Sequence, residues 1–182
     1  PLVSVWYYKK KRETIFVFRV DTDFCTKTNA ELLYKICNKY NIPGTWFLDT
    51  SNENILKSNY KKMVSQELAL HCNRHKVFNN EILNRDNIQT GLKLLNKAGI
   101  KVVGFAAPYG DWNPSLANSI SSFKYSSEFS LDYDNFPFYP YINDQISNVL
   151  QIPIHPISIG RLKRSHYSKI EMANYYINIM KN

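Results

Sequence analysis

Short apolar segments alternate with amphipathic segments along most of the chain, and this alternation predicts β-strands separated by α-helices. Residues 14–20 are β-branched and aromatic almost without interruption, which is typical of a strand covered on both faces. Comparable segments recur downstream, and the expected strands are 14–20, 45–48, 67–70, 101–105, 125–127 and 149–154. This succession predicts an α/β fold with a single parallel sheet, and it has too few strands for a complete eight-stranded barrel.

Helical periodicity and capping residues mark the segments between these strands. Thr28 matches a capping box with Glu31, and the apolar residues that follow fall on one stripe. The expected N-caps are Thr28, Asp86, Asn113 and Ser168, and a more polar helix is expected over residues 54–64. Ile170, Ile177 and Met180 are expected on the buried side of the last helix.

Polar side chains gather where several of these strands end. Asp21 and Asp23 follow the first strand. His71 and His75 follow the third strand, and His155 follows the last. Ligand sites in parallel sheets lie at the carboxyl ends of the strands, so these side chains are expected to converge at one rim of the sheet.

The acidic pair and the histidine pair together suit a divalent metal. Two carboxylates this close are stable together only when a cation neutralises one of them or one holds a proton. Two histidines and one carboxylate leave an open coordination position, which is the catalytic arrangement for zinc, and the same ligands suit cobalt, iron, manganese and nickel. Two other interpretations stay open: the spacing of His71 and His75 is common by chance, and Asp21 pairs with Arg19 in a purely structural arrangement.

His155 and the turn at 108–110 offer further chemistry. His155 is either a general acid for the leaving group or a hydrogen-bonded histidine in a turn that its flanking prolines fix. The segment 108–110 is by itself only a turn signal, but a rigid loop there would aim the Tyr109 backbone N–H at an oxyanion. Cys72 lies between the two histidines and is expected to be a packing residue.

Composition bears mainly on the choice of partners. The 182 residues are expected to form one domain, 1–182, with a basic N-terminal extension over residues 1–13. The net charge of +8 favours anionic partners, and basic residues are densest over 9–12 and 161–164. These blocks are either solvated loops or contacts for an anionic glycan, a nucleotide-sugar or a membrane that carries a lipid-linked saccharide. Nucleic acid is not an expected partner, because no nucleic-acid-binding motif accompanies the charge, and no oligomeric state is predicted.

No apolar run is long enough to cross a bilayer, and no signal-peptide pattern precedes the first strand. A cytoplasmic location is therefore expected, with association at the membrane face where glycan precursors are built. Three cysteines without a C-x-x-C pair give no disulfide framework, in agreement with a reducing compartment.

Five segments resemble, in order, the motifs of the polysaccharide deacetylase (NodB-homology) superfamily of metal-dependent carbohydrate esterases. They are Arg19-Val20-Asp21-Thr22-Asp23, residues 41–48, His71-x-x-x-His75, Ala107-Pro108-Tyr109-Gly110 and Ile152-Pro153-Ile154-His155. The resemblance covers residues 15–158 and implies that the parallel sheet belongs to an irregular (β/α)7 barrel.

By position, the resemblance implies that Asp23, His71 and His75 are the ligands of a divalent metal, with zinc expected first. The other implied roles are Asp21 as general base, His155 as general acid, Tyr109 as backbone oxyanion donor, and Pro108, Tyr109 and Ile152 as substrate-binding residues.

Two departures from the superfamily pattern concern the surroundings of the base. The third motif usually carries an arginine that steadies the catalytic aspartate, and Ala106 occupies that place. Either Arg19 or Arg74 substitutes for it, or activity is reduced. The fourth motif, an aspartate with a tryptophan, has no clear counterpart, because residues 128–134 are acidic and aromatic but contain no tryptophan.

The leading functional expectation is a metal-dependent hydrolase that removes an N-acetyl or formyl group from an amino sugar of a polysaccharide or glycan precursor. The aromatic residues that would offer sugar-stacking faces are Tyr109, Tyr133, Phe136, Phe138 and Tyr139. One alternative is a non-carbohydrate amide or imide hydrolase of the same superfamily, which the missing tryptophan favours. The other is a catalytically degenerate saccharide-binding domain, which Ala106 favours.

Overall fold

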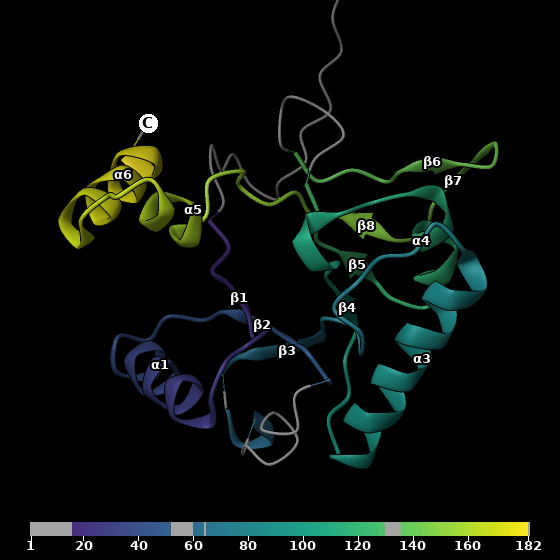
Figure 1. Cartoon of the computed structure of the whole chain (residues 1–182), viewed down its shortest axis with the longest axis horizontal. Helices are drawn as coiled ribbons and strands as arrows, with labels where there is room; N and C mark the ends of the chain where they lie inside the picture. Colours follow the sequence, from purple (N-terminus) through teal and green to yellow (C-terminus); the bar gives the residue numbers. More distant parts are fainter. Residues whose placement is uncertain (1–15, 52–59, 64, 130–135, 182) are drawn as a thin grey trace, which may run out of the picture.

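A half barrel of parallel strands forms the centre of the molecule. The computed structural model describes residues 16–51, 60–63, 65–129 and 136–181. The strands of the sheet are β1 (Arg19–Asp21), β2 (Thr45–Leu48), β3 (Glu67–Leu70), β4 (Gly104–Phe105), β5 (Tyr125–Ser126) and β8 (Leu150–Gln151). They pair in parallel in the order β1-β2-β3-β4-β5-β8, and the sheet curls on itself (Figure 1). The predicted parallel α/β fold of the barrel type is therefore confirmed.

The observed strands are shorter than the apolar segments that predict them. β1 begins at Arg19, and residues 14–15 of the predicted strand lie outside the described residues. β4 covers only the last two residues of the predicted segment 101–105. β8 ends at Gln151 rather than residue 154. Backbone pairing nevertheless continues past the end of β8, because the Ile152 N–H donates to Ser126 O and the Ile154 N–H donates to Glu128 O.

Helices pack against the outer face of the curled sheet. They are α1 (Lys27–Lys39), α3 (Glu81–Lys97) and α4 (Pro114–Ser119). The 3-10 helices are η1 (Tyr60–Lys62) and η2 (Pro108–Gly110), and the antiparallel hairpin consists of β6 (Tyr141–Ile142) and β7 (Gln145–Ile146). The chain continues into α5 (Ile159–Arg164) and α6 (Lys169–Lys181). The sequence did not predict the hairpin or α5, and residues 54–59 and 64 of the predicted polar helix lie outside the described residues.

The sheet has apolar side chains on both of its faces. Trp46 and Leu48 of β2 belong to the large outer cluster, which also contains Ile88 and Leu95 of α3. Phe47, between them, points to the inside of the curl, where the small inner cluster consists of Phe47, Ala69 and Ala106 with Tyr125 packed against them. Burial of every residue of β2 explains why its sequence is apolar without alternation.

Two of the four predicted helix caps are wrong. α1 is capped by Thr26, whose Oγ1 accepts a hydrogen bond from the Asn29 N–H, so Thr28 lies inside the first turn. α3 is capped by Asn80, whose Oδ1 accepts from the Leu83 N–H, so Asp86 lies within the helix. In both places a side chain that meets the requirement for an extended backbone and a polar acceptor stands earlier in the chain than the predicted cap. The caps at Asn113 and Ser168 are confirmed.

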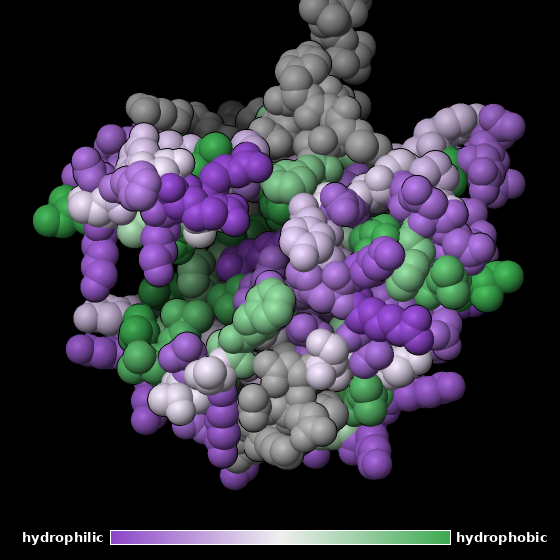
Figure 2. Space-filling view, in the orientation of Figure 1, coloured by the Kyte–Doolittle hydropathy of each residue, from purple (hydrophilic) through white to green (hydrophobic). Residues whose placement is uncertain are grey.

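The apolar residues of α6 are not buried, which corrects the prediction for this helix. Ile170 is 74% exposed and Met180 is 48% exposed. The reason is position: α5 and α6 lie beside the barrel rather than on the sheet, and the surface is hollowed between them and α1 (Figures 1 and 2). Among the described residues, no helix is long and apolar enough to cross a membrane.

Candidate active site

Asp23, His71 and His75 come together at the rim where β1 and β3 end. Asp23 Oδ1 lies 3.5 Å from His71 Nε2, and Asp23 Oδ2 lies 3.5 Å from His75 Nε2. One ligand atom from each residue lies within 4.8 Å of the other two. The donor atoms of a tetrahedral zinc site lie about 3.4 Å apart, given bond lengths near 2.1 Å. The spacing of these three side chains therefore fits one metal ion, as the sequence predicts.

The strand geometry fixes the first histidine of this group. His71 follows β3 directly, its backbone N–H donates to Leu48 O, and its side chain is buried. Its Nδ1 lies 2.9 Å from Ala106 O, and because a carbonyl oxygen only accepts, Nδ1 carries the proton. A neutral His71 then turns the lone pair of Nε2 toward Asp23, and a cation between these two acceptors stabilises the arrangement. A backbone carbonyl behind the ring is the usual support of a metal-ligating histidine.

The electrostatics of Asp23 also suit a cation site. When His71 and His75 are protonated rather than neutral, a hydrogen bond from His71 holds the pKa of Asp23 below its usual value, and the positive charges of the two imidazoles act in the same direction. Partial burial raises the pKa but does not outweigh them. Asp23 is therefore anionic at neutral pH, as a carboxylate that held a metal would be.

The loop that carries His75 is held by Asn87, which sequence reasoning missed. Asn87 is a buried residue of α3, and its Oδ1 accepts from the backbone N–H groups of Asn73 and Arg74. Its Nδ2 donates to Arg74 O and Lys76 O. One side chain thus provides hydrogen-bond partners for backbone groups at both ends of the tight turn between the two histidines. The available signal was an asparagine on the buried face of an amphipathic helix, because a polar group there needs partners.

Asp21 is held by Arg19 from two positions earlier on β1. Arg19 Nε donates to Asp21 Oδ1 at 2.7 Å, and Arg19 Nη2 donates to Oδ2 at 2.9 Å. Arg19 Nη1 reaches across the curl of the sheet to Ser127 O and Oγ. The guanidinium also lies over the Phe47 ring, 4.8 Å from its centroid. The Asp21–Arg19 pair of the structural interpretation is therefore present, and it fixes both carboxylate oxygens while leaving each a second lone pair.

The turn at η2 carries Tyr109 in a left-handed conformation, with φ 60° and ψ 4°. Pro108 is buried, and Gly110 also has positive φ, where an added Cβ would lie 2.6 Å from Phe129. The Tyr109 side chain is 70% exposed and contacts the His75 ring, with centroids 4.8 Å apart. The turn predicted at 108–110 therefore lies beside the Asp23–His71–His75 group.

Glu128 is a buried carboxyl behind this turn. Its Oε1 accepts from the Ala107 N–H at 3.1 Å, and its Oε2 lies 3.5 Å from Gln151 Nε2. Burial raises the pKa of Glu128 to about 7, although hydrogen bonds from Ser126 and Ala107 and the charge of Arg19 oppose the rise. Sequence reasoning placed Glu128 in an acidic stretch without a role. The structure makes it a link between the segment before Tyr109 and the end of β8.

A sequence model of the polysaccharide deacetylase family matches residues 10–127, well over half of the chain. The chain belongs to the polysaccharide deacetylase family. The predicted resemblance is confirmed, and with it the assignment to an enzyme family of carbohydrate esterases. A comparison with curated protein sequences gives no match.

Solved structures of deacetylases and esterases share the fold. A Mycobacterium smegmatis protein assigned as a polysaccharide deacetylase is 21% identical, with a TM-score of 0.59 over 77% of this chain and 58% of that one. The Streptococcus pyogenes deacetylase PplD in complex with acetate is 16% identical, with a TM-score of 0.56 over 88% of this chain and 74% of that one. A family 4 acetyl xylan esterase from Clostridium thermocellum with a cobalt ion is 18% identical, with a TM-score of 0.50 over 67% of this chain and 62% of that one. The chain thus spans just over half the length of the Mycobacterium structure.

The structure resolves which arginine lies on Asp21 in this deacetylase-family chain. Ala106, at the place of the family arginine, is fully buried in the inner cluster beside Phe47 and Ala69. Arg74 is exposed and lies 3.8 Å from Asp86 of α3. Arg19 therefore fills the position next to Asp21, and Arg74 does not.

His155 and Ile152 lie on the segment that follows β8, at the opposite edge of the sheet from β1. Ile152 is half-buried, and its N–H donates to Ser126 O. His155 is exposed, and its Nε2 lies 3.1 Å from the Tyr175 hydroxyl of α6. Its ring also contacts Tyr176. The described contacts of His155 are thus with α6, a partner that the sequence did not predict.

Cys72 is expected to be functionally silent in this deacetylase fold. Burial raises the pKa of its thiol to about 12, so the thiolate is scarce at neutral pH. Its Sγ donates to Arg74 O at 3.0 Å, which a serine hydroxyl also does. We expect Cys72→Ser to retain its metal content and to change thermal stability by less than about 1 kcal/mol, measured by elemental analysis and thermal unfolding. Loss of metal in this variant would show that Cys72 is more than a packing residue.

Proposed function

We propose that this protein hydrolyses an N-acetyl or formyl group from an amino sugar of a polysaccharide or glycan precursor, with a divalent metal at Asp23, His71 and His75. The observation that carries the proposal is the geometry of these three side chains, whose donor atoms lie at the spacing of metal ligands at the open rim of the sheet. Zinc is the first expectation, and the cobalt ion in the Clostridium esterase supports cobalt as a substitute.

The bound metal would lower the pKa of a water molecule and polarise the acyl carbonyl. Asp21 accepts the proton of the attacking water, and the fork of Arg19 keeps its carboxylate oriented for that transfer. The Tyr109 backbone N–H donates a hydrogen bond to the developing oxyanion, with Pro108 fixing the turn. His155 gives a proton to the departing amine. Its Nε2 is engaged by Tyr175, so Nδ1 is the nitrogen that would deliver this proton.

The products of this reaction are a carboxylate and a free amino sugar. The acyl C–N bond breaks, and the oxygen of water forms the new C–O bond. Pro108, Tyr109 and Ile152 would contact the substrate. The net charge of +8 supports an anionic carrier, such as a lipid-linked or nucleotide-linked saccharide. The proposal also includes a cytoplasmic location at a membrane surface, and this part of it rests on the sequence alone.

Two alternatives differ from the proposal in ways that can be measured. A catalytically degenerate saccharide-binding domain is favoured by Ala106, but the contact of Arg19 with Asp21 counts against it. A non-carbohydrate imide hydrolase is favoured by the absence of the family tryptophan from residues 128–134.

Acetate release from N-acetylated chitooligosaccharides, measured beside hydrolysis of a cyclic imide, tests all three. We expect acetate release from the saccharides, loss of activity with a chelator, and recovery with zinc or cobalt. Hydrolysis of the imide alone would favour the non-carbohydrate enzyme. Bound metal without hydrolysis of either substrate would favour the binding domain, and failure to bind zinc, cobalt or iron would overturn the metal site.

A further inference from the structure

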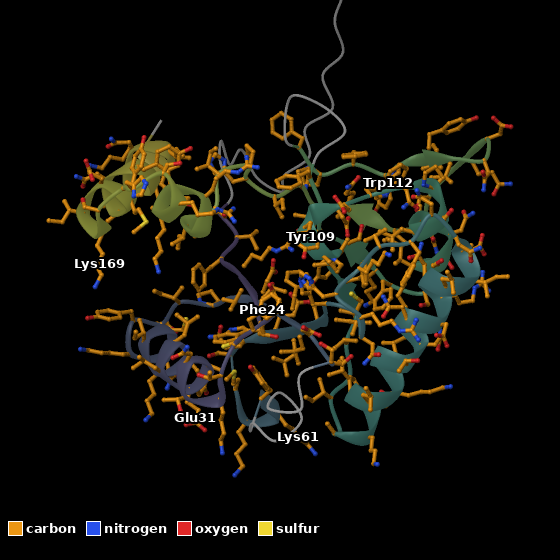
Figure 3. The ribbon with its side chains drawn as sticks, viewed as in Figure 1. Phe24, Glu31, Lys61, Tyr109, Trp112 and Lys169 are labelled. Atoms are coloured by element: carbon orange, nitrogen blue, oxygen red, sulfur yellow. The ribbon has the colours of Figure 1, made fainter. Side chains whose placement is uncertain are left out.

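Two exposed aromatic rings contact the imidazole of His75. Phe24 lies one residue after Asp23, and its ring centroid is 5.8 Å from that of His75, with an interplanar angle of 63°. Tyr109 approaches the same imidazole at 4.8 Å and 72°. Neither ring lies flat on His75, and Phe24 and Tyr109 are 84% and 70% exposed, so ring faces remain open to solvent beside the metal-site residues. Figure 3 labels both residues near the middle of the view.

The backbone of both residues is strained. Phe24 has φ 57° and Tyr109 has φ 60°, in the left-handed region that bulky side chains disfavour. The other described non-glycine residues at positive φ are Asn41, Ser65, Cys72, Asn143, Asp144 and His166. Among the described residues at positive φ, only Phe24 and Tyr109 thus carry a benzene ring, and both contact the same histidine. Neither ring is buried, so no gain in apolar burial offsets the backbone strain. Stability alone therefore gives no reason for an aromatic residue in place of glycine or asparagine.

We propose that Phe24 and Tyr109 form an aromatic clamp that seats a pyranose ring of the substrate beside Asp23, His71 and His75. The proposal rests on the proposed function and specifies how its substrate class is recognised. A pyranose has a face of C–H groups, which packs on the electron-rich face of an aromatic ring and removes apolar surface of both from water. His75 fixes the position of both rings, so the clamp and the metal site keep a constant separation. The structure therefore assigns to Phe24 a selectivity for cyclic sugars over compact amides that lack such a face.

Phe24→Gly tests the clamp with a variant that also relieves backbone strain. We expect KM for acetate release from N-acetylated chitooligosaccharides to rise about tenfold, on the basis that about half of the ring surface is covered by the sugar. We expect Tm to stay equal or to rise by a few degrees, because glycine adopts positive φ without strain. Phe24→Tyr retains the ring, and its KM should equal that of the parent protein. Tyr141→Ala is the matched control, since Tyr141 is a similarly exposed aromatic residue on the β6–β7 hairpin.

The outcomes separate the clamp from the proposed function. An unchanged KM in Phe24→Gly, with acetate release intact, would overturn the clamp and leave the deacetylase proposal standing. A fall in Tm together with a raised KM would assign Phe24 a structural role and would also overturn it. If the parent protein releases no acetate, the proposed function fails, and calorimetric binding of the same saccharides replaces KM. A Kd about tenfold weaker in Phe24→Gly would then support the clamp, and the absence of binding by the parent would overturn it.

Discussion

Asp21→Asn is expected to lower kcat for acetate release by about 10²–10⁴-fold while metal content stays at that of the parent protein. Asparagine has the shape of aspartate, and its amide oxygen still accepts one of the two hydrogen bonds from Arg19, whereas its amide nitrogen cannot accept the other. It has no basic oxygen to take a proton from water, so the proton transfer is lost while Asp23, His71 and His75 are unchanged. Steady-state kinetics on N-acetylated chitooligosaccharides and elemental mass spectrometry on the same samples measure the two effects.

His75→Ala is the matched contrast to Asp21→Asn. This variant removes one of the three proposed metal ligands. We expect it to lose both metal and turnover while most of the fold persists, because the His75 side chain is at the rim of the sheet. Retained turnover in Asp21→Asn would remove Asp21 from the role of base. Metal loss in Asp21→Asn would make Asp21 a ligand instead, and Arg19 would then be the partner of a ligand rather than of a base.

The fold was predictable because its strands are marked by local pattern. β2 and β3 lie where apolar segments predict them, since buried parallel strands need apolar residues on both faces. The ends of elements were less predictable. Thr26 and Thr28 carry the same side chain, and the choice between them depends on where the chain leaves the sheet, which is a tertiary property. The exposure of α6 was unpredictable for a similar reason. An apolar stripe indicates that burial would be favourable, but it does not indicate whether another surface lies close enough to cover it.

The convergence of the proposed metal ligands was predictable, but much of their support was not. Asp23, His71 and His75 come together because parallel strands end at one rim, and that rule needs only the order of strands and motifs. Asn87 and Glu128 hold the site together through contacts that span more than ten residues of sequence. Neither lies in a motif with a known spacing, so only the structure reveals them. Arg19 was one of two possible replacements for the arginine missing at Ala106, and no sequence pattern distinguishes it from Arg74 in this role.

Glu128→Gln is expected to stabilise the protein at pH 8 and to have little effect at pH 4.5. Glu128 is fully buried, and its pKa is raised to about 7 chiefly by burial. In the unfolded chain the carboxyl has a pKa near its ordinary value of 4.5. Between about pH 4.5 and pH 7 the folded state therefore holds a proton that the unfolded state has released, and the free energy of unfolding falls as pH rises through this window.

The size of this effect follows from the width of the window. One pKa unit corresponds to about 1.4 kcal/mol, so the loss of stability from Glu128 approaches about 3 kcal/mol above pH 7. The charge of Arg19 and the hydrogen bonds from Ser126 and Ala107 already oppose the rise in pKa. Urea unfolding of the parent and of Glu128→Gln at several pH values measures the difference, and groups that titrate alike in both proteins cancel. Glu31→Gln, which makes the same substitution at an exposed position on α1, is the control.

Glutamine suits this site because it resembles the protonated acid. Its carbonyl oxygen still accepts from the Ala107 N–H. In the structure Gln151 Nε2 faces Glu128 Oε2, so the new amide group donates to Gln151 only if the Gln151 amide turns over and presents Oε1, which has no hydrogen-bond partner among the described residues. The turn that carries Tyr109 is then held without a buried charge. A stability gain that does not vary with pH would mean that Glu128 has the same charge in the folded and unfolded states. In that case Arg19 and the hydrogen bonds from Ser126 and Ala107 would be compensating fully for the burial of the carboxylate, and Arg19 would serve Glu128 as well as Asp21.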